Sequence, residues 1–143
     1  MKNLKEEEPG RSSASLAEIP KTMTALARAQ RVTERASDFG FDWPEPGPVW
    51  RKLDEELAEL KAAVGSEDKV RIKEEAGDLF FSLVNLSRFL DLEAEEALSG
   101  AVDRFVKRFA HIEARIAEQR KRLTESTLEE MDLLWEEAKR MER

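Results

Sequence analysis

Residues 71–85 read RIKEEAGDLFFSLVN, and this stretch decides the fold. A line of polar side chains runs along it at the spacing of one helical face, i, i+4, i+7, i+11 and i+14. Its later half, continued to residue 90, is otherwise apolar on almost every side. Such a helix belongs at the centre of a helical protein, so we predict a central helix over about residues 67–90. The polar line consists of Arg71, Glu75, Asp78, Ser82 and Asn85.

Apolar residues also recur at helical spacing before and after this stretch. They predict helices over residues 20–39, over about 50–65, over 93–121 and over 127–141. Three prolines make residues 41–48 a loop, because proline removes a backbone donor and restricts the residue before it. No strand-like alternation persists along the sequence. We therefore predict an all-α fold, an antiparallel bundle of about four to five helices.

The composition limits the classes of function. The chain has 143 residues, which suits one compact domain, and we expect residues 18–143 to form it behind a flexible lead at 1–17. A net charge of −7 disfavours binding to nucleic-acid polymers, and the absence of cysteine excludes disulfides and cysteine-ligated metals. Residues 1–16 carry charges in place of the apolar core of a secretion signal, and no apolar run approaches the roughly 20 residues that cross a bilayer. We therefore expect a cytoplasmic protein that does not bind membranes.

Two pairs of acids stand on neighbouring predicted helices, Glu56 with Glu59 and Glu75 with Asp78. Random placement of 31 acidic residues gives roughly six or seven pairs of this spacing, so spacing alone proves little. Each pair nevertheless shares one helix face, and a buried carboxylate is costly unless a cation or strong donors compensate it. We predict that the four acids converge on a hard divalent cation, Mg²⁺ or Mn²⁺. Ion pairs with basic neighbours on solvated faces are the alternative, and on charged helices they are the more frequent case.

Basic residues gather on one face of the helix predicted at 93–121, opposite an apolar stripe that includes Phe105. Guanidinium groups beside metal-bound carboxylates suit a polyphosphate, because they bind the phosphate charge that the cations leave uncompensated. A solvated charged surface is the alternative interpretation. The basic residues are Arg104, Lys107, Arg108 and His111.

Several aromatic residues are candidates to stack on a nucleobase. Residues of this kind are more often packing residues, particularly beside prolines or at helical spacing. No P-loop, dinucleotide-binding, serine-hydrolase or zincin motif competes with the acid pairs. The aromatic candidates are Phe41, Trp43, Trp50 and Trp135.

The sequence resembles the MazG nucleoside triphosphate pyrophosphohydrolases, and in particular the C-terminal domain of their two-domain members. The resemblance covers nearly the whole chain. It is carried by LAEIP at 16–20, GFDWP at 40–44, EELAE at 55–59, EEAGDLFF at 74–81, VNLSR at 84–88, RFVKRF at 104–109 and the segment around Trp135. The family signature is ExxE followed about twenty residues later by ExxD, and here it falls on the same four acids that share helix faces.

The resemblance implies hydrolysis of nucleoside triphosphates between the α and β phosphates, which yields a monophosphate and pyrophosphate with Mg²⁺. By position, the four acids would be the metal ligands and catalytic residues, and Trp135 would lie near the base. The family also implies a homodimer or a higher homo-oligomer in which helices of two subunits complete each bundle. The residues that match phosphate-contacting positions are Lys52, Arg71, Arg104 and Arg108.

Three functions remain open on the sequence. The first is a pyrophosphohydrolase of broad or moderate selectivity. The second is a selective relative that acts on dUTP or dCTP, or on phosphoribosyl-ATP, with the same acid scaffold and a different base pocket. The third is a non-catalytic helical module for dimerisation or regulation, and the intact acids of both motifs argue against it.

Overall fold

The computed structural model describes residues 16–143, and over these residues the protein is all-helical without strands. This confirms the predicted all-α class, while residues 1–15 of the expected flexible lead lie outside the described part. Contacts divide the chain into two compact units, one that ends at Glu96 and one that spans Ala97–Arg143, and each is described by itself. The elements are α1 (Ala25–Asp38), α2 (Pro46–Ser66), α3 (Lys69–Phe89), α4 (Ala94–Glu118), the 3-10 helix η1 (Leu123–Glu125) and α5 (Leu128–Met141).

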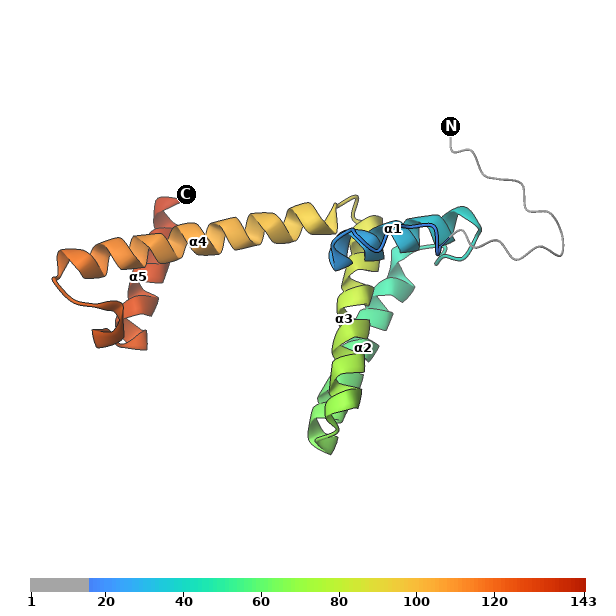
Figure 1. Cartoon of the computed structure of the whole chain (residues 1–143), viewed down its shortest axis with the longest axis horizontal. Coiled ribbons are helices and arrows are strands. Elements are labelled where there is room, and N and C mark those ends of the chain that lie inside the picture. Colours follow the sequence, from blue (N-terminus) through green and yellow to red (C-terminus); the bar gives the residue numbers. More distant parts are fainter. Residues whose placement is uncertain (1–15) are drawn as a thin grey trace. The chain divides into compact units, whose positions relative to one another are not determined.

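Helices α2 and α3 form an antiparallel hairpin with a two-residue connection (Figure 1). Glu67 ends α2 in the left-handed conformation, with φ of 57°, and Asp68 then caps α3 by accepting hydrogen bonds from the backbone N–H groups of Val70 and Arg71. The predicted loop over 41–48 is wrong in its last part, because α2 already begins at Pro46. A proline suits the first turn of a helix, whose N–H groups have no partner within the helix.

Helix α1 packs against α3 and is fixed to the connection between α3 and α4 by Gln30. The buried Gln30 amide donates to the Leu92 carbonyl at 2.8 Å and accepts from the Ala94 N–H at 2.7 Å. The predicted start at residue 20 is wrong, because Thr24 caps α1 with its side chain and the helix begins at Ala25. The Gln30 contacts position α1 beside the end of α3.

The first unit buries few large apolar side chains. Val84 and Leu86 of α3 are buried, but Phe80 is 66% exposed and Leu83 is half exposed. The prediction that the apolar half of α3 lies at the centre is therefore wrong for a single chain. α3 packs on α1 and α2 along one side and leaves a large apolar surface uncovered on the other.

In the second unit, the chain turns after α4 through η1 and returns as α5 (Figure 1). Ile112 and Ile116 of α4 are buried, as is Ala138 of α5. The rings of Phe105 and Trp135 are tilted against each other with centroids 5.1 Å apart. These contacts bring the predicted basic face of α4 next to the aromatic residue of α5.

Candidate functional site

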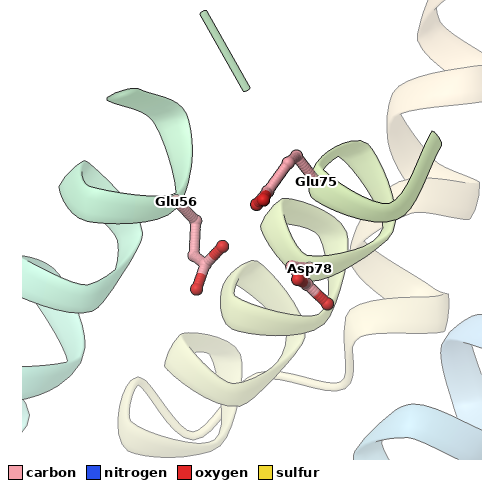
Figure 2. Close-up of side chains that lie close together, drawn as sticks. All are labelled: Glu56, Glu75 and Asp78. Atoms are coloured by element: carbon pink, nitrogen blue, oxygen red, sulfur yellow. The ribbon is translucent and has the colours of Figure 1, made fainter. Parts of the chain in front are cut away.

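Three of the four predicted acids meet between α2 and α3. Figure 2 shows Glu56 of α2 and Glu75 of α3 extending towards each other, with Asp78 one turn further along α3. Each offers one carboxylate oxygen, and these three oxygens all lie within 4.8 Å of one another. Glu56 is only 4% exposed, Glu75 is half-buried and Asp78 is exposed, so the cluster reaches from the helix interface to the surface.

Glu59, the fourth acid, lies beside the cluster without belonging to the group of three. A hydrogen bond with Glu75, together with the negative charge of Glu56, raises the pKa of Glu59 above its usual value. Carboxylates this close repel each other unless a proton or a cation lies between them. The ExxE and ExxD segments therefore produce a region of concentrated negative charge.

The cluster contains buried carboxylate oxygens that no donor satisfies. Glu56 Oε2 and Glu75 Oε2 are both buried and have no hydrogen-bond partner among residues 16–143. A buried anionic oxygen without a partner is costly, so such atoms need a compensating charge. Oxygen donors from three carboxylates are the ligand set that Mg²⁺ and Mn²⁺ prefer, so these residues fit a hard divalent cation.

Lys52 supplies the positive charge that the chain itself brings to the cluster. Its Nζ lies 2.9 Å from Glu56 Oε1 and 3.6 Å from Glu55 Oε1, and the hydrogen bond with Glu56 raises the pKa of Lys52. The ion-pair alternative is thus realised for one oxygen of one acid. One ammonium group does not balance four carboxylates, and the unpaired oxygens of Glu56 and Glu75 remain.

Arg71, the predicted phosphate ligand on α3, lies one turn before Glu75. Its backbone N–H binds the cap residue Asp68, and its exposed side chain has no partner within residues 16–143. The guanidinium is therefore available to an anion near the acid cluster.

Arg108 and Trp135 meet in the second unit. The Arg108 guanidinium lies over the Trp135 ring, 5.3 Å from its centroid, and makes a bidentate ion pair with Glu142, with Nη2 to Oε2 at 2.9 Å and Nε to Oε1 at 3.1 Å. The pair raises the pKa of Arg108 and lowers that of Glu142, to which the charge of the exposed Arg104 also contributes. The predicted placement of the basic face opposite the Phe105 stripe is wrong for Arg108, because both side chains contact Trp135.

Sequence reasoning missed a second polar group, which lies at a cavity beside the end of α3. Arg88 donates to both oxygens of Asp42, with the Nη2–Oδ1 distance 2.8 Å, and to Asn85 Oδ1 at 2.6 Å. A cavity of about 380 Å³ is lined by these three residues and by Trp43 and Phe81, among others. The signals in the sequence were the acid within GFDWP and the Asn–x–x–Arg spacing of Asn85 and Arg88. Neither signal predicts the contact between Asp42 and Arg88, which are 46 residues apart.

Comparison with known proteins identifies a domain in the middle of the chain. Residues 48–113 match the model of the MazG nucleotide pyrophosphohydrolase domain. The chain is 44% identical over 138 residues, 96% of its length, to the nucleoside triphosphate pyrophosphohydrolase/pyrophosphatase MazG of Thermotoga maritima. It is 39% identical over 131 residues, 90% of its length, to the nucleoside triphosphate pyrophosphohydrolase of Escherichia coli. Residues 48–113 of the chain thus form a MazG nucleotide pyrophosphohydrolase domain.

The chain spans about half the length of these two relatives, 53% of the Thermotoga protein and 50% of the Escherichia protein. It is also 39% identical over 144 residues to the uncharacterized protein YabN of Bacillus subtilis, covering 29% of that protein. The segment matched by the MazG model contains the four acids and the predicted phosphate ligands, but not Trp43 or Trp135. Among the helices of residues 16–143, none has the length and apolar character to cross a membrane.

Proposed function

We propose that this chain is a metal-dependent nucleoside triphosphate pyrophosphohydrolase, which cleaves between the α and β phosphates and releases a monophosphate and pyrophosphate. The observation that carries the proposal is the meeting of three carboxylate oxygens, all within 4.8 Å, from Glu56, Glu75 and Asp78. The names of the Thermotoga and Escherichia relatives support the activity. Mg²⁺ is the proposed ion, with Mn²⁺ as its substitute, because the donors are carboxylate oxygens alone.

The four acids would hold the metal and orient the attacking water. A bound divalent ion polarises phosphoryl oxygens and lowers the pKa of a coordinated water. The water oxygen attacks the α-phosphorus, the bond from that phosphorus to the bridging oxygen breaks, and pyrophosphate leaves with the bond's electrons. The water gives up its proton to a carboxylate, for which Glu59 and Glu75 are the candidates. No covalent intermediate with the protein is required.

Basic residues would bind the phosphates that the ion does not neutralise. Arg71 is suited to this because its exposed guanidinium has no partner in the described chain and lies one turn from Glu75. Arg108 binds the Glu142 carboxylate in a bidentate geometry, and it would use the same geometry with phosphate oxygens. Lys52 and Arg104 complete the proposed set.

Trp43 and Trp135 are the proposed contacts to the nucleobase. Trp43 lines the cavity beside the end of α3 and is 44% exposed, so its ring is accessible for stacking. Trp135 is half-buried between Phe105 and Arg108. A partly exposed indole stacks well on the flat face of a base.

A homodimer or a higher homo-oligomer belongs to the same proposal. Trp50 and Leu57 of α2 and Phe80 and Leu83 of α3 are large apolar residues with two fifths or more of their surface exposed in the single chain. Large apolar side chains exposed in such number are commonly covered by a partner, and helices from a second copy would cover them. Since its substrates are nucleotides, we expect the protein in the cytoplasm. Light scattering on the purified chain tests the assembly, and a monomer at every concentration contradicts it.

The test of the activity is a panel of canonical and modified ribo- and deoxyribonucleoside triphosphates with Mg²⁺. We expect monophosphate and pyrophosphate as the separated products. Diphosphate with inorganic phosphate would assign a different bond. If neither the panel nor phosphoribosyl-ATP is hydrolysed, the proposed activity is wrong and the alternative of a non-catalytic helical module is favoured. A single preferred deoxynucleotide would identify the selective relative.

A further inference from the structure

The cavity beside the end of α3 contains a hydrogen-bonding chain whose last group has no partner. Asp42 accepts from the Trp43 backbone N–H at 2.9 Å and from Arg88 through both carboxylate oxygens. Arg88 donates in turn to Asn85 Oδ1 from Nη2 at 2.6 Å and from Nε at 3.1 Å. The loop that carries Trp43 is thereby fixed to α3.

Arg88 determines which way the Asn85 amide faces. A guanidinium has only N–H donors, so the atom of Asn85 that meets it must be the oxygen. The amide NH₂ group therefore points away from Arg88, and within residues 16–143 it has no acceptor. Asn85 lines the cavity, so the group that it offers to a molecule bound there is a donor.

Two other polar side chains at the cavity, Thr33 and Arg88, make hydrogen bonds within the chain. Thr33 donates its hydroxyl to backbone carbonyls of its own helix at Ala29 and Gln30. Arg88 uses Nε, Nη1 and Nη2 on Asp42 and Asn85, which makes it a positioning residue. The Asn85 NH₂ group, the Trp43 indole N–H and the second N–H of Arg88 Nη1 therefore remain without an acceptor within the described chain, and all three are donors.

The size and lining of the cavity suit a nucleobase. About 380 Å³ lies within the range of small-molecule sites, and Phe41, Trp43 and Phe81 offer aromatic surface for stacking. Asn85 follows Asp78 by seven residues on the same face of α3, which is about 10.5 Å along the helix axis. That length is comparable to the distance from the α-phosphate of a nucleotide to the far edge of its base.

We propose that the Asn85 NH₂ group, oriented by Arg88, selects nucleobases that present a keto oxygen over those that present an amino group. The inference rests on the proposed function and names its preferred substrates, which are uracil-, thymine-, guanine- or hypoxanthine-type nucleotides. A keto oxygen accepts from Asn85, whereas the amino group of cytosine or adenine sets a donor against a donor and leaves both unpaired. An unpaired polar group at such a site lowers kcat/KM about 10- to 100-fold.

Two matched substrate pairs test the inference on the full chain. dUTP and dCTP differ at the 4-position, and ITP and ATP differ at the 6-position, in both cases by keto against amino. We expect the keto member to have the higher kcat/KM by about 10-fold or more in at least one pair. Ratios within threefold in both pairs, or a preference for the amino member in either, overturn the inference while turnover itself upholds the proposed function. No turnover of any nucleotide defeats the proposed function instead.

The variant Asn85→Asp tests the residue. It keeps an oxygen towards Arg88 and removes the donors, so we expect the keto-to-amino ratio to fall to about one or to invert. Ser87→Ala is the control, because Ser87 lies on the same helix and its hydroxyl donates to the Leu83 carbonyl. A wild-type ratio retained by Asn85→Asp overturns the assignment. Calorimetric titration of IMP and AMP into both proteins gives the same comparison without catalysis, and it decides the matter if the variant is inactive.

Discussion

The two units differ in how their charged side chains are paired. Between α2 and α3, carboxylates gather around buried oxygens of Glu56 and Glu75 that accept no hydrogen bond from the described part of the chain. In the second unit, the Arg108 guanidinium has a carboxylate of its own chain, Glu142, in a bidentate pair. In the proposed function, the acid cluster takes up a cation from solution, whereas a phosphate would have to displace Glu142 from Arg108. We therefore expect a divalent cation to stabilise the folded chain by binding the acid cluster, and a phosphate to compete with Glu142 for Arg108.

The largest effect is expected at the acid cluster. Asp78→Asn removes a charged ligand, and loss of several kcal/mol of charge stabilisation corresponds to about a 100-fold or greater fall in kcat. Pyrophosphate release with saturating Mg²⁺ measures it. Glu74→Gln is the matched control, because Glu74 is an exposed acid next to Glu75 that does not belong to the cluster. Equal activity of Asp78→Asn and Glu74→Gln would show that the cluster is not the site.

The next effect concerns Arg108. We expect Arg108→Ala to weaken triphosphate binding about 10- to 100-fold, because a charge-assisted hydrogen bond to phosphate contributes about 1.5–3 kcal/mol. Arg108→Lys should recover part of this, since an ammonium keeps the charge and loses the bidentate geometry. Arg140→Ala, an exposed arginine on α5, is the control. Titration with a non-hydrolysable triphosphate at low salt measures the affinities, and unchanged binding of Arg108→Ala would contradict the role.

The effect of Mg²⁺ on the thermal stability of the chain distinguishes the acid cluster from the Arg108 site. An ion that binds only the folded chain stabilises it by about 2.7 kcal/mol at 100 times its Kd, which raises Tm by about 5–10 °C for a chain of this size. We expect the shift in the wild type and not in Asp78→Asn. Without divalent ions, Asp78→Asn should unfold no earlier than the wild type, because it removes one of several repelling charges. A rise in Tm of equal size with NaCl at matched ionic strength would show that Mg²⁺ acts only by screening charge.

Helical periodicity predicted that Glu75 and Asp78 share one face of α3, whereas their approach to Glu56 depends on the hairpin of α2 and α3. The same rule predicted the stripe on α4, of which Ile112 and Ile116 are buried. Such features depend on residues within two or three turns of each other. The apolar half of α3 shows the limit, since periodicity reveals how many sides of a helix avoid water but not which chain covers them.

The features that the sequence did not predict join distant segments. The amide of Gln30 is bonded to the chain at Leu92 and Ala94, and Arg88 reaches Asp42 across 46 positions. Each depends on where a loop returns, which no local pattern encodes. Glu142 is missed for the same reason. A charged residue at the end of a helix is ordinarily solvated, and only the approach of α5 to α4 gives it a partner.

Glu142 gives the finest test of the comparison. If it occupies the guanidinium that a phosphate needs, Glu142→Gln removes a competitor and lowers KM about two- to fivefold, as expected for an exposed ion pair. Glu129→Gln, an exposed acid in the first turn of α5, should leave KM unchanged.

The pKa of Glu142 is lowered in the folded chain, so the pair's stabilisation is present above the usual carboxyl pKa and is lost as pH falls through the lowered value. Unfolding midpoints of wild type and Glu142→Gln should therefore differ at pH 7 and converge in acid. A difference that persists below the lowered pKa would mean that Glu142 acts through packing, and the KM effect would then need another cause.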